Sequence, residues 1–200
     1  MSGSSGHVRR SLIAFGLALV LAACSPDRVA FRNTDITGAS YASDFSLTDA
    51  AGKARTLADF RGKVVSVFFG YTSCPDVCPI TLAEMRELKT ALGADGDRLQ
   101  VVFITVDPER DSAQVLGPYA AAFDPSFVAL RGSPAEIAAT AKAFKVVYEK
   151  VPGSTPDSYT MNHTAGSYVF DPQGRVRLFV RHGQGLEPLI GDIRQLLAGR

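Results

Sequence analysis

The chain carries almost no net charge and has no block of lysine and arginine. Its 21 basic residues nearly balance its 20 acidic ones, which gives a formal net charge of +1 over 200 residues. Electrostatic binding to nucleic acid needs a basic patch, so this balance argues against a nucleic-acid partner. Internal repeats are also missing, and 46% hydrophobic residues is too many for a disordered chain. We therefore expect one globular domain with a short appendage.

The hydrophobic run near the N-terminus is too short to cross a membrane. It follows two arginines, begins with residues 11–20 and covers roughly a dozen positions, whereas a membrane span needs about 20. It ends in Leu21-Ala22-Ala23-Cys24, which resembles the cleavage motif of bacterial lipoproteins. This pattern predicts a signal peptide over residues 1–23 and a lipid on Cys24. An uncleaved anchor with an unmodified Cys24 is the alternative.

The residues that follow are mostly polar and predict a tether over 24–42, ahead of a folded domain over 43–200. With either form of the N-terminus we expect this domain to lie on the periplasmic side of a bacterial membrane.

Cysteine is scarce, because Cys74 and Cys78 are the only ones after Cys24. In an oxidising compartment, a neighbouring pair forms either a disulfide or a metal site. A disulfide that closes so short a loop stabilises little.

Strand and helix patterns alternate along the domain. The predicted elements are hairpins over 45–57 and 167–180, strands over 64–69, 99–106, 127–130 and 146–151, helices from 79, over 133–144 and over 186–197, a helical region over 107–123 and a turn-rich loop over 152–166. Prolines at positions 79 and 134 suit the first turns of helices. The order of these elements predicts an α/β fold, a thioredoxin-like sandwich with an N-terminal β-hairpin and an insertion.

Cys74 and Cys78 fall between the strand over 64–69 and the helix that begins at Pro79. The positive end of a helix dipole favours thiolates at this place, as in thioredoxin-like proteins. The spacing is C-x-x-x-C, however, and not the C-x-x-C of dithiol oxidoreductases. The two sulfurs can therefore serve electron transfer, metal binding or both.

His163 is the candidate third ligand, because it lies just before the predicted strand at 167, in a loop that faces the cysteines in a thioredoxin-like sheet. Thioredoxin-type oxidoreductases carry a cis-proline near this point, and no proline stands here. Two thiolates and one imidazole form a soft ligand set that suits Cu(I), zinc or iron–sulfur chemistry. Structural zinc needs a fourth ligand. His182 is a candidate for it, but we expect His182 to end a hairpin strand in solvent.

Several other side chains near these motifs have two open interpretations. Met85 is either a soft ligand or a core residue, and its place in the apolar stripe of its helix favours the core. Met161 is either a soft ligand or loop packing. Asp76, Asp107 and Asp111 either cap helices and turns or orient the ligands of the site.

Motifs over most of the domain resemble the Sco/SenC family of copper-binding proteins, which serve cytochrome c oxidase assembly. The segments that carry the resemblance are 57–63, 68–79 with Cys-Pro-Asp-Val-Cys-Pro after Gly-Tyr-Thr, 106–111 with Val-Asp-Pro-Glu-Arg-Asp, 162–164 with Asn-His-Thr, and 171–174 with Asp-Pro-Gln-Gly. Asn162 stands where many members of the family have aspartate. A lipoprotein motif also replaces the transmembrane helix of many members.

This resemblance implies that Cys74, Cys78 and His163 bind copper as Cu(I), Cu(II) or both. It implies a copper chaperone, and not an enzyme, that delivers copper to the dinuclear copper site of cytochrome c oxidase subunit II. Another periplasmic protein would then donate the copper. The implied protein is held to the membrane through the lipid on Cys24.

Two alternatives remain for the cysteine pair. A thiol–disulfide oxidoreductase would cycle Cys74 and Cys78 between dithiol and disulfide, and would keep the copper-site cysteines of the oxidase reduced. A peroxiredoxin-like peroxidase would share the fold, but Val67 and Tyr71 occupy the positions of that family's proline and threonine.

Overall fold

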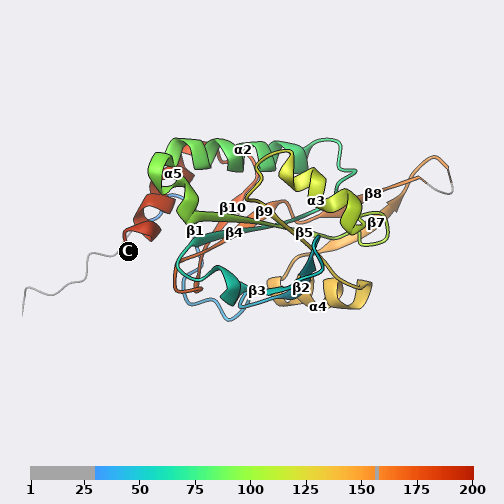
Figure 1. Ribbon diagram of the computed structural model, residues 1–200, viewed down its shortest axis with the longest axis horizontal. Helices are drawn as coiled ribbons and strands as arrows, with labels where there is room; N and C mark the ends of the chain where they lie inside the picture. Colours follow the sequence, from blue (N-terminus) through green and yellow to red (C-terminus); the bar gives the residue numbers. More distant parts are fainter. Residues whose placement is uncertain (1–29, 156–157) are drawn as a thin grey trace, which may run out of the picture. The chain divides into compact units, whose positions relative to one another are not determined.

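An eight-stranded mixed sheet organises the computed structural model, which describes residues 30–155 and 158–200. The strand order is β1-β10-β9-β4-β5-β6-β2-β3. Strands β4, β5 and β6 run parallel to one another, and all other neighbours in the sheet are antiparallel. The sheet belongs to one compact unit, Phe31–Arg200. A second sheet consists of β7 and β8 alone (Figure 1).

The bounds of the elements follow the sequence pattern closely in most of the domain. The strands are β1 (Thr34–Asp35), β2 (Ser46–Asp49), β3 (Ala54–Thr56), β4 (Val64–Gly70), β5 (Leu99–Thr105), β6 (Val128–Arg131), β7 (Tyr148–Pro152), β8 (Tyr159–His163), β9 (Gly166–Phe170) and β10 (Val176–Arg181). The helices are η1 (Leu57–Phe60), α2 (Val77–Leu92), η2 (Gly93–Arg98), α3 (Ala113–Ala121), α4 (Pro134–Phe144) and α5 (Leu186–Leu197).

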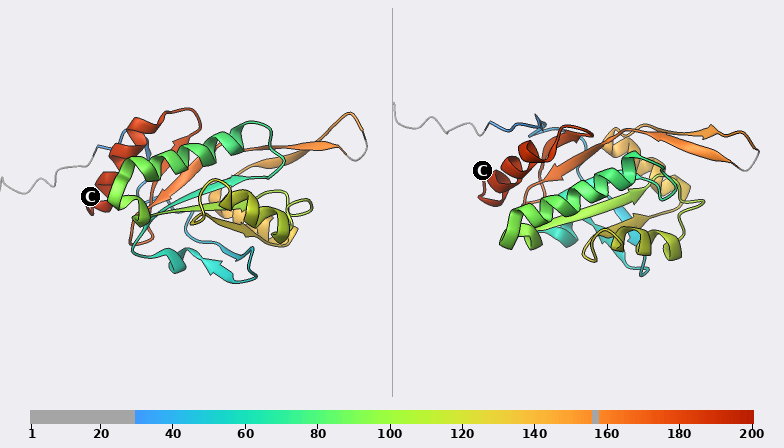
Figure 2. Two further views of the ribbon diagram at one scale, coloured as in Figure 1. Left: turned by 45° about the horizontal axis from the view of Figure 1, so that its top comes forward. Right: turned by 90° about the horizontal axis from the view of Figure 1, so that it is seen from above.

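Helices cover both faces of the central strands. Helices α2, α3 and α5 lie on one face and α4 lies on the other (Figures 1 and 2). Every residue of β4 and β5 is buried, which is why these strands are continuous apolar runs without alternation. A set of phenylalanines fills the space around them, namely Phe68, Phe69, Phe103, Phe144 and Phe170. This arrangement confirms the predicted thioredoxin-like α/β sandwich with an N-terminal hairpin.

The predicted helical region over 107–123 is wrong in its first part. Helix α3 begins only at Ala113, and it continues through Pro118 before it ends at Ala121. The residues before it form turns, in which the carboxylate of Asp111 accepts hydrogen bonds from Thr72 and Thr105.

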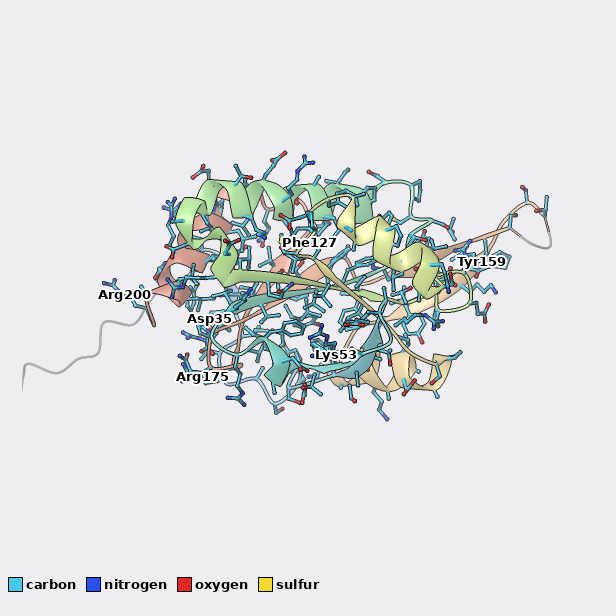
Figure 3. The ribbon with its side chains drawn as sticks, viewed as in Figure 1. Asp35, Lys53, Phe127, Tyr159, Arg175 and Arg200 are labelled. Carbon is cyan, nitrogen blue, oxygen red and sulfur yellow. The ribbon has the colours of Figure 1, made fainter. Side chains whose placement is uncertain are left out.

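The predicted loop over 152–166 is also wrong, because it contains the strand β8. Strand β8 pairs antiparallel with β7, with Tyr148 opposite His163 and Pro152 opposite Tyr159. Much of this pair is exposed, so the alternation of apolar and polar residues that reveals a half-buried strand is absent. The hairpin extends from the end of the unit opposite Arg175 and Arg200, and Tyr159 lies on it (Figure 3).

The folded unit begins before the predicted end of the tether. Strand β1 pairs with β10, and Ala42 is completely buried. Residues 31–42 are thus part of the domain and not a spacer. The predicted signal peptide 1–23 and Cys24 lie outside the described residues. None of the helices among the described residues is long and apolar enough to cross a membrane.

Asp192 of α5 fastens this N-terminal segment to the domain. Its carboxylate is fully buried and accepts the backbone N–H groups of Arg32 and Asn33 and the side-chain amide of Asn33. Buried donors that lose their acceptor are costly, so these bonds fix the start of the fold.

We expect Asp192→Ala to lower the free energy of unfolding by about 1–3 kcal/mol, because buried donors on two residues lose their acceptor. Urea unfolding followed by circular dichroism measures the change. The exposed Asp97→Ala is the matched control and should change the stability by less than about 0.5 kcal/mol. Equal stabilities of both variants would contradict this role of Asp192.

Candidate metal centre

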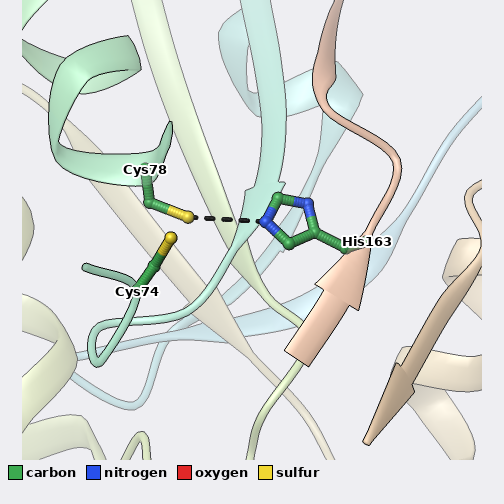
Figure 4. Close-up of side chains that lie close together, drawn as sticks. All are labelled: Cys74, Cys78 and His163. Carbon is green, nitrogen blue, oxygen red and sulfur yellow. Dashed lines mark hydrogen bonds between the residues drawn. The ribbon is translucent and has the colours of Figure 1, made fainter. Parts of the chain in front are cut away.

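Cys74, Cys78 and His163 come together at the carboxyl ends of the parallel strands. Cys74 lies in the loop after β4, Cys78 in the first turn of α2 and His163 at the end of β8. Their ligand atoms all lie within 4.8 Å of one another. The Sγ of Cys78 is 3.5 Å from the Nε2 of His163, and the sulfur of Cys74 points to the same place (Figure 4). Two sulfurs and one imidazole nitrogen thus converge on a single point.

The end of β4 and the start of α2 hold Cys78 in place. Helix α2 begins at Val77, two residues before the predicted start, so Cys78 belongs to its first turn and faces the positive end of the helix dipole. Cys78 is fully buried against Gly70. A Cβ atom on Gly70 would stand 2.7 Å from the Sγ of Cys78 and 2.7 Å from the Cε2 of Phe103. Only glycine leaves room for the sulfur here.

The loop that carries Cys74 is tied to the end of β5 through Asp111. The fully buried carboxylate of Asp111 accepts bonds from the backbone N–H of Thr72 at 3.1 Å, from its hydroxyl at 2.6 Å and from the hydroxyl of Thr105 at 2.6 Å. Of the two interpretations of this aspartate, the structure supports orientation of the site. Asp76 is exposed at the N-cap of α2, and its side chain makes no cap hydrogen bond.

His163 presents its Nε2 to the sulfurs as an acceptor. Its Nδ1 lies 3.1 Å from the carbonyl oxygen of Thr164, which can only accept a hydrogen bond. The proton therefore sits on Nδ1, and the lone pair of Nε2 faces Cys78. Burial lowers the pKa of His163 and outweighs the opposing effect of the Thr164 bond. The rings of Phe68 and Tyr71 flank the imidazole edge-on at 5.9 and 6.1 Å. A neutral imidazole in this orientation is ready to bind a metal.

Burial also determines the state of Cys78 before a metal binds. It raises the pKa of the Cys78 thiol, and the nearby Cys74 raises it further, so the thiol stays protonated at neutral pH. The S–H of Cys78 can then donate to the Nε2 of His163. A soft metal ion must displace this proton, so the affinity for the metal rises with pH.

The remaining candidates have other surroundings. His182 is exposed, as expected, and its Nδ1 lies 3.3 Å from the hydroxyl of Thr81. Met85 is buried in the core, where its sulfur accepts the hydroxyl of Ser66 at 3.6 Å. Met161 is buried on β8, among residues on the side of the hairpin that faces Asp107 and Glu109.

Sequence reasoning missed the residues that shape the centre without binding a metal. Gly70 follows an apolar strand, where a glycine signals a close approach of other atoms, and this signal was available. Arg110 and Tyr159 contact each other across the domain. No local pattern reveals such a contact.

Comparisons with known proteins identify the chain. The family model described as SCO1/SenC matches residues 33–198. This chain belongs to the SCO1/SenC family. The mitochondrial SCO2 homolog of Mus musculus is 35% identical over 157 residues, which cover 78% of this chain and 62% of that protein. The chain thus spans about three-fifths of the length of the first curated relatives it matches.

Solved structures of the family have the same fold. ScoI of Bradyrhizobium japonicum, solved with copper bound, is 42% identical, with a TM-score of 0.70 over 77% of this chain and 98% of that one. A SCO1/SenC family lipoprotein of Bacillus anthracis is 25% identical, with a TM-score of 0.69 over 84% of this chain and 99% of that one. The positions of Cys74, Cys78 and His163 in this chain suit the binding of a metal ion.

We expect Gly70→Ala to displace the Cys78 sulfur and to lower the free energy of unfolding by about 1–3 kcal/mol, because the added methyl overpacks the site. Urea unfolding measures this. Gly191→Ala is the matched control, because it makes the same change in α5, where the added methyl meets no atom within 4 Å. The control should leave the stability unchanged or raise it by up to about 1 kcal/mol. Equal losses in both variants would show that Gly70 has no special role.

We expect iodoacetamide to modify Cys74 at least about tenfold faster than Cys78 at pH 7.5, since Cys78 is buried and its raised pKa leaves little thiolate. Mass spectrometry of Cys74→Ser and Cys78→Ser variants, both with Cys24→Ser, isolates each rate. The ratio should fall toward one in urea and the Cys78 rate should rise with pH. Equal rates in the folded protein would be inconsistent with this geometry.

Proposed function

We propose that this protein is a copper chaperone that holds copper with Cys74, Cys78 and His163. The observation that carries the proposal is the convergence of two sulfurs and one imidazole nitrogen within 4.8 Å. Such a three-ligand set is soft and fits Cu(I) better than zinc, which prefers four ligands in structural sites. The Bradyrhizobium relative with copper bound supports the same assignment.

The proposed acceptor is the dinuclear copper site of cytochrome c oxidase subunit II. The Sco family is described as a family of cytochrome c oxidase assembly proteins, which supports an oxidase partner. Copper leaves by exchange of ligands, one at a time. Cys74 and His163 are both partly exposed, whereas Cys78 is fully buried. Incoming ligands therefore replace His163 and Cys74 first, and Cys78 releases the ion last.

The proposed location is the periplasmic side of a bacterial membrane, with a lipid on Cys24 as the anchor and a periplasmic copper donor. The family lipoprotein of Bacillus anthracis supports this. Because the folded unit begins at Phe31, residues 25–30 alone would separate it from the lipid. They span at most about 20 Å, so the anchor would keep the domain close to the membrane surface.

A thiol–disulfide oxidoreductase is the second candidate, favoured by the two free sulfurs, which lie near each other. In that role Cys74 and Cys78 would form a disulfide while a disulfide of the oxidase gains two electrons and two protons. The oxidoreductase needs no ligand at His163, whereas the chaperone does. Copper affinity in a His163 variant therefore distinguishes the two functions.

We expect the full chain with Cys24→Ser, reduced and in detergent, to bind one Cu(I) tightly against a competing chelator. His163→Ala should weaken binding at least about tenfold and Cys74→Ser at least about a hundredfold, since each removes a ligand. His182→Ala is the matched control and should leave the affinity unchanged, because His182 is exposed outside the centre.

Two other outcomes would change the proposed function or the proposed site. Weak copper binding that does not depend on His163, together with stoichiometric reduction of a disulfide substrate by the wild-type dithiol, would replace the chaperone with the oxidoreductase. Tight binding that His182→Ala weakens as much as His163→Ala would place the site elsewhere.

A further inference from the structure

The strand that carries His163 does not belong to the main sheet. Strand β8 has β7 as its strand partner, and the pair extends as a hairpin from the end of the unit (Figures 1 and 3). His163 is at the base of this hairpin and Tyr159 stands about 13 Å further out along β8. The direction in which the hairpin leans therefore sets where the imidazole points. Side chains outside the hairpin must fix that direction.

Arg110 holds the outer part of the hairpin, next to an exposed ion pair of Glu109 with Lys150 of β7. Its guanidinium carbon lies 3.6 Å from the centre of the Tyr159 ring, and its Nη1 donates to the carbonyl oxygen of Tyr159 at 2.9 Å. Its Nε donates to Asp107, and the hydroxyl of Tyr159 donates to the same carboxylate at 2.9 Å. Arg110, Asp107 and Tyr159 thus form a closed ring of contacts, which we call the latch. Lys150 of β7 also lies over the Tyr159 ring, at 3.8 Å.

The same arginine reaches the cysteine side of the centre. Its guanidinium lies 5.7 Å from the centre of the Tyr71 ring, and Tyr71 belongs to the loop that leads to Cys74. The Tyr71 ring in turn contacts the imidazole of His163 edge-on. The next residue, Asp111, fixes Thr72 of that loop. The short segment between β5 and α3 therefore holds both halves of the centre in register.

We propose that Arg110 is the positioning residue for His163. It locks the β7–β8 hairpin so that the imidazole faces the two sulfurs, and opening of the latch lets His163 leave the metal first. This inference rests on the proposed copper site and assigns the control of copper release to the latch. The Nη2 of Arg110 is buried and has no hydrogen-bond partner in the part of the chain that the structure describes, so the latch does not use every donor of the guanidinium.

The test is a double-mutant cycle on copper binding. Arg110→Lys keeps the positive charge but loses the planar set of donors that binds Asp107 and the Tyr159 carbonyl. We expect it to weaken Cu(I) binding about tenfold, as losses of groups that orient ligands do. The Cu(II) absorption spectrum should shift toward that of His163→Ala. In the His163→Ala background, Arg110→Lys should change neither the affinity nor the spectrum, because the residue that it positions is gone.

Arg177→Lys is the matched control for this cycle. Arg177 also stacks on an aromatic ring, that of Phe31 at 5.2 Å. Its other partners are Asp171 in the turn before β10, Thr37 in the segment after β1 and the carbonyl oxygen of Arg200. It should leave copper affinity unchanged. Tyr159→Phe is the second latch variant, because it keeps the ring and removes only the bond to Asp107. It should weaken copper binding less than Arg110→Lys does and in the same His163-dependent way.

A readout without copper separates this inference from the proposed function. In NMR spectra of the metal-free full chain in detergent, Arg110→Lys should shift or broaden the ring signals of His163 and leave those of His182 unchanged. The latch is overturned if the His163 signals do not move, or if Arg110→Lys weakens copper binding equally with and without His163. Equal copper affinities of the wild-type protein and His163→Ala would instead overturn the copper site, whatever the NMR spectra show. Urea unfolding of each metal-free variant identifies any that fail to fold, and Tyr159→Phe then decides.

Discussion

The contact between the sulfur of Cys78 and the backbone of Gly70 is the constraint on which the centre depends. Strand β4 is buried on both faces and ends at Gly70, and α2 starts only a few residues later with Cys78 in its first turn. The sulfur can occupy the end of the sheet only because position 70 has no side chain. Once Cys78 is fixed there, the short spacing places Cys74 beside it. The third ligand must then come from a distant part of the chain.

Asp107 and Asp111 hold the two segments of the chain that carry the three candidate ligands. Both are buried at the end of β5, but their partners differ. Asp111 binds the hydroxyls of Thr72 and Thr105 and so holds the cysteine loop. Asp107 binds Arg110 and the hydroxyl of Tyr159 and so holds the histidine hairpin. A buried carboxylate without such partners is costly, which keeps both segments closed around the two aspartates.

The sequence was sufficient for elements with strong local signals. The continuous apolar runs of β4 and β5, helix α4 with Pro134 in its first turn, and helix α5 all formed where they were predicted. Strands β1 and β8 were missed because both are short or largely exposed, so tertiary pairing and not periodicity defines them. The cysteine pair could be predicted as part of a site, because Cys74 and Cys78 are closely spaced between a strand and a helix. The contact of Arg110 with Tyr159 was not, because it exists only after distant segments have packed.

In the proposed role the protein must bind copper firmly and still release it, and the placement of the proposed ligands separates these two requirements. Cys78 is fully buried at a position where the surrounding side chains leave it little freedom, so in the proposed site it would supply a fixed anchor for the ion. His163 stands on a hairpin outside the main sheet, so its departure requires no break in the eight-stranded sheet. Loss of one ligand from a soft three-ligand site lowers affinity in a single step and frees a coordination position for an acceptor. In our proposal the latch sets the free energy of that step, because the contacts of Tyr159 with Arg110 and Asp107 hold the hairpin in place.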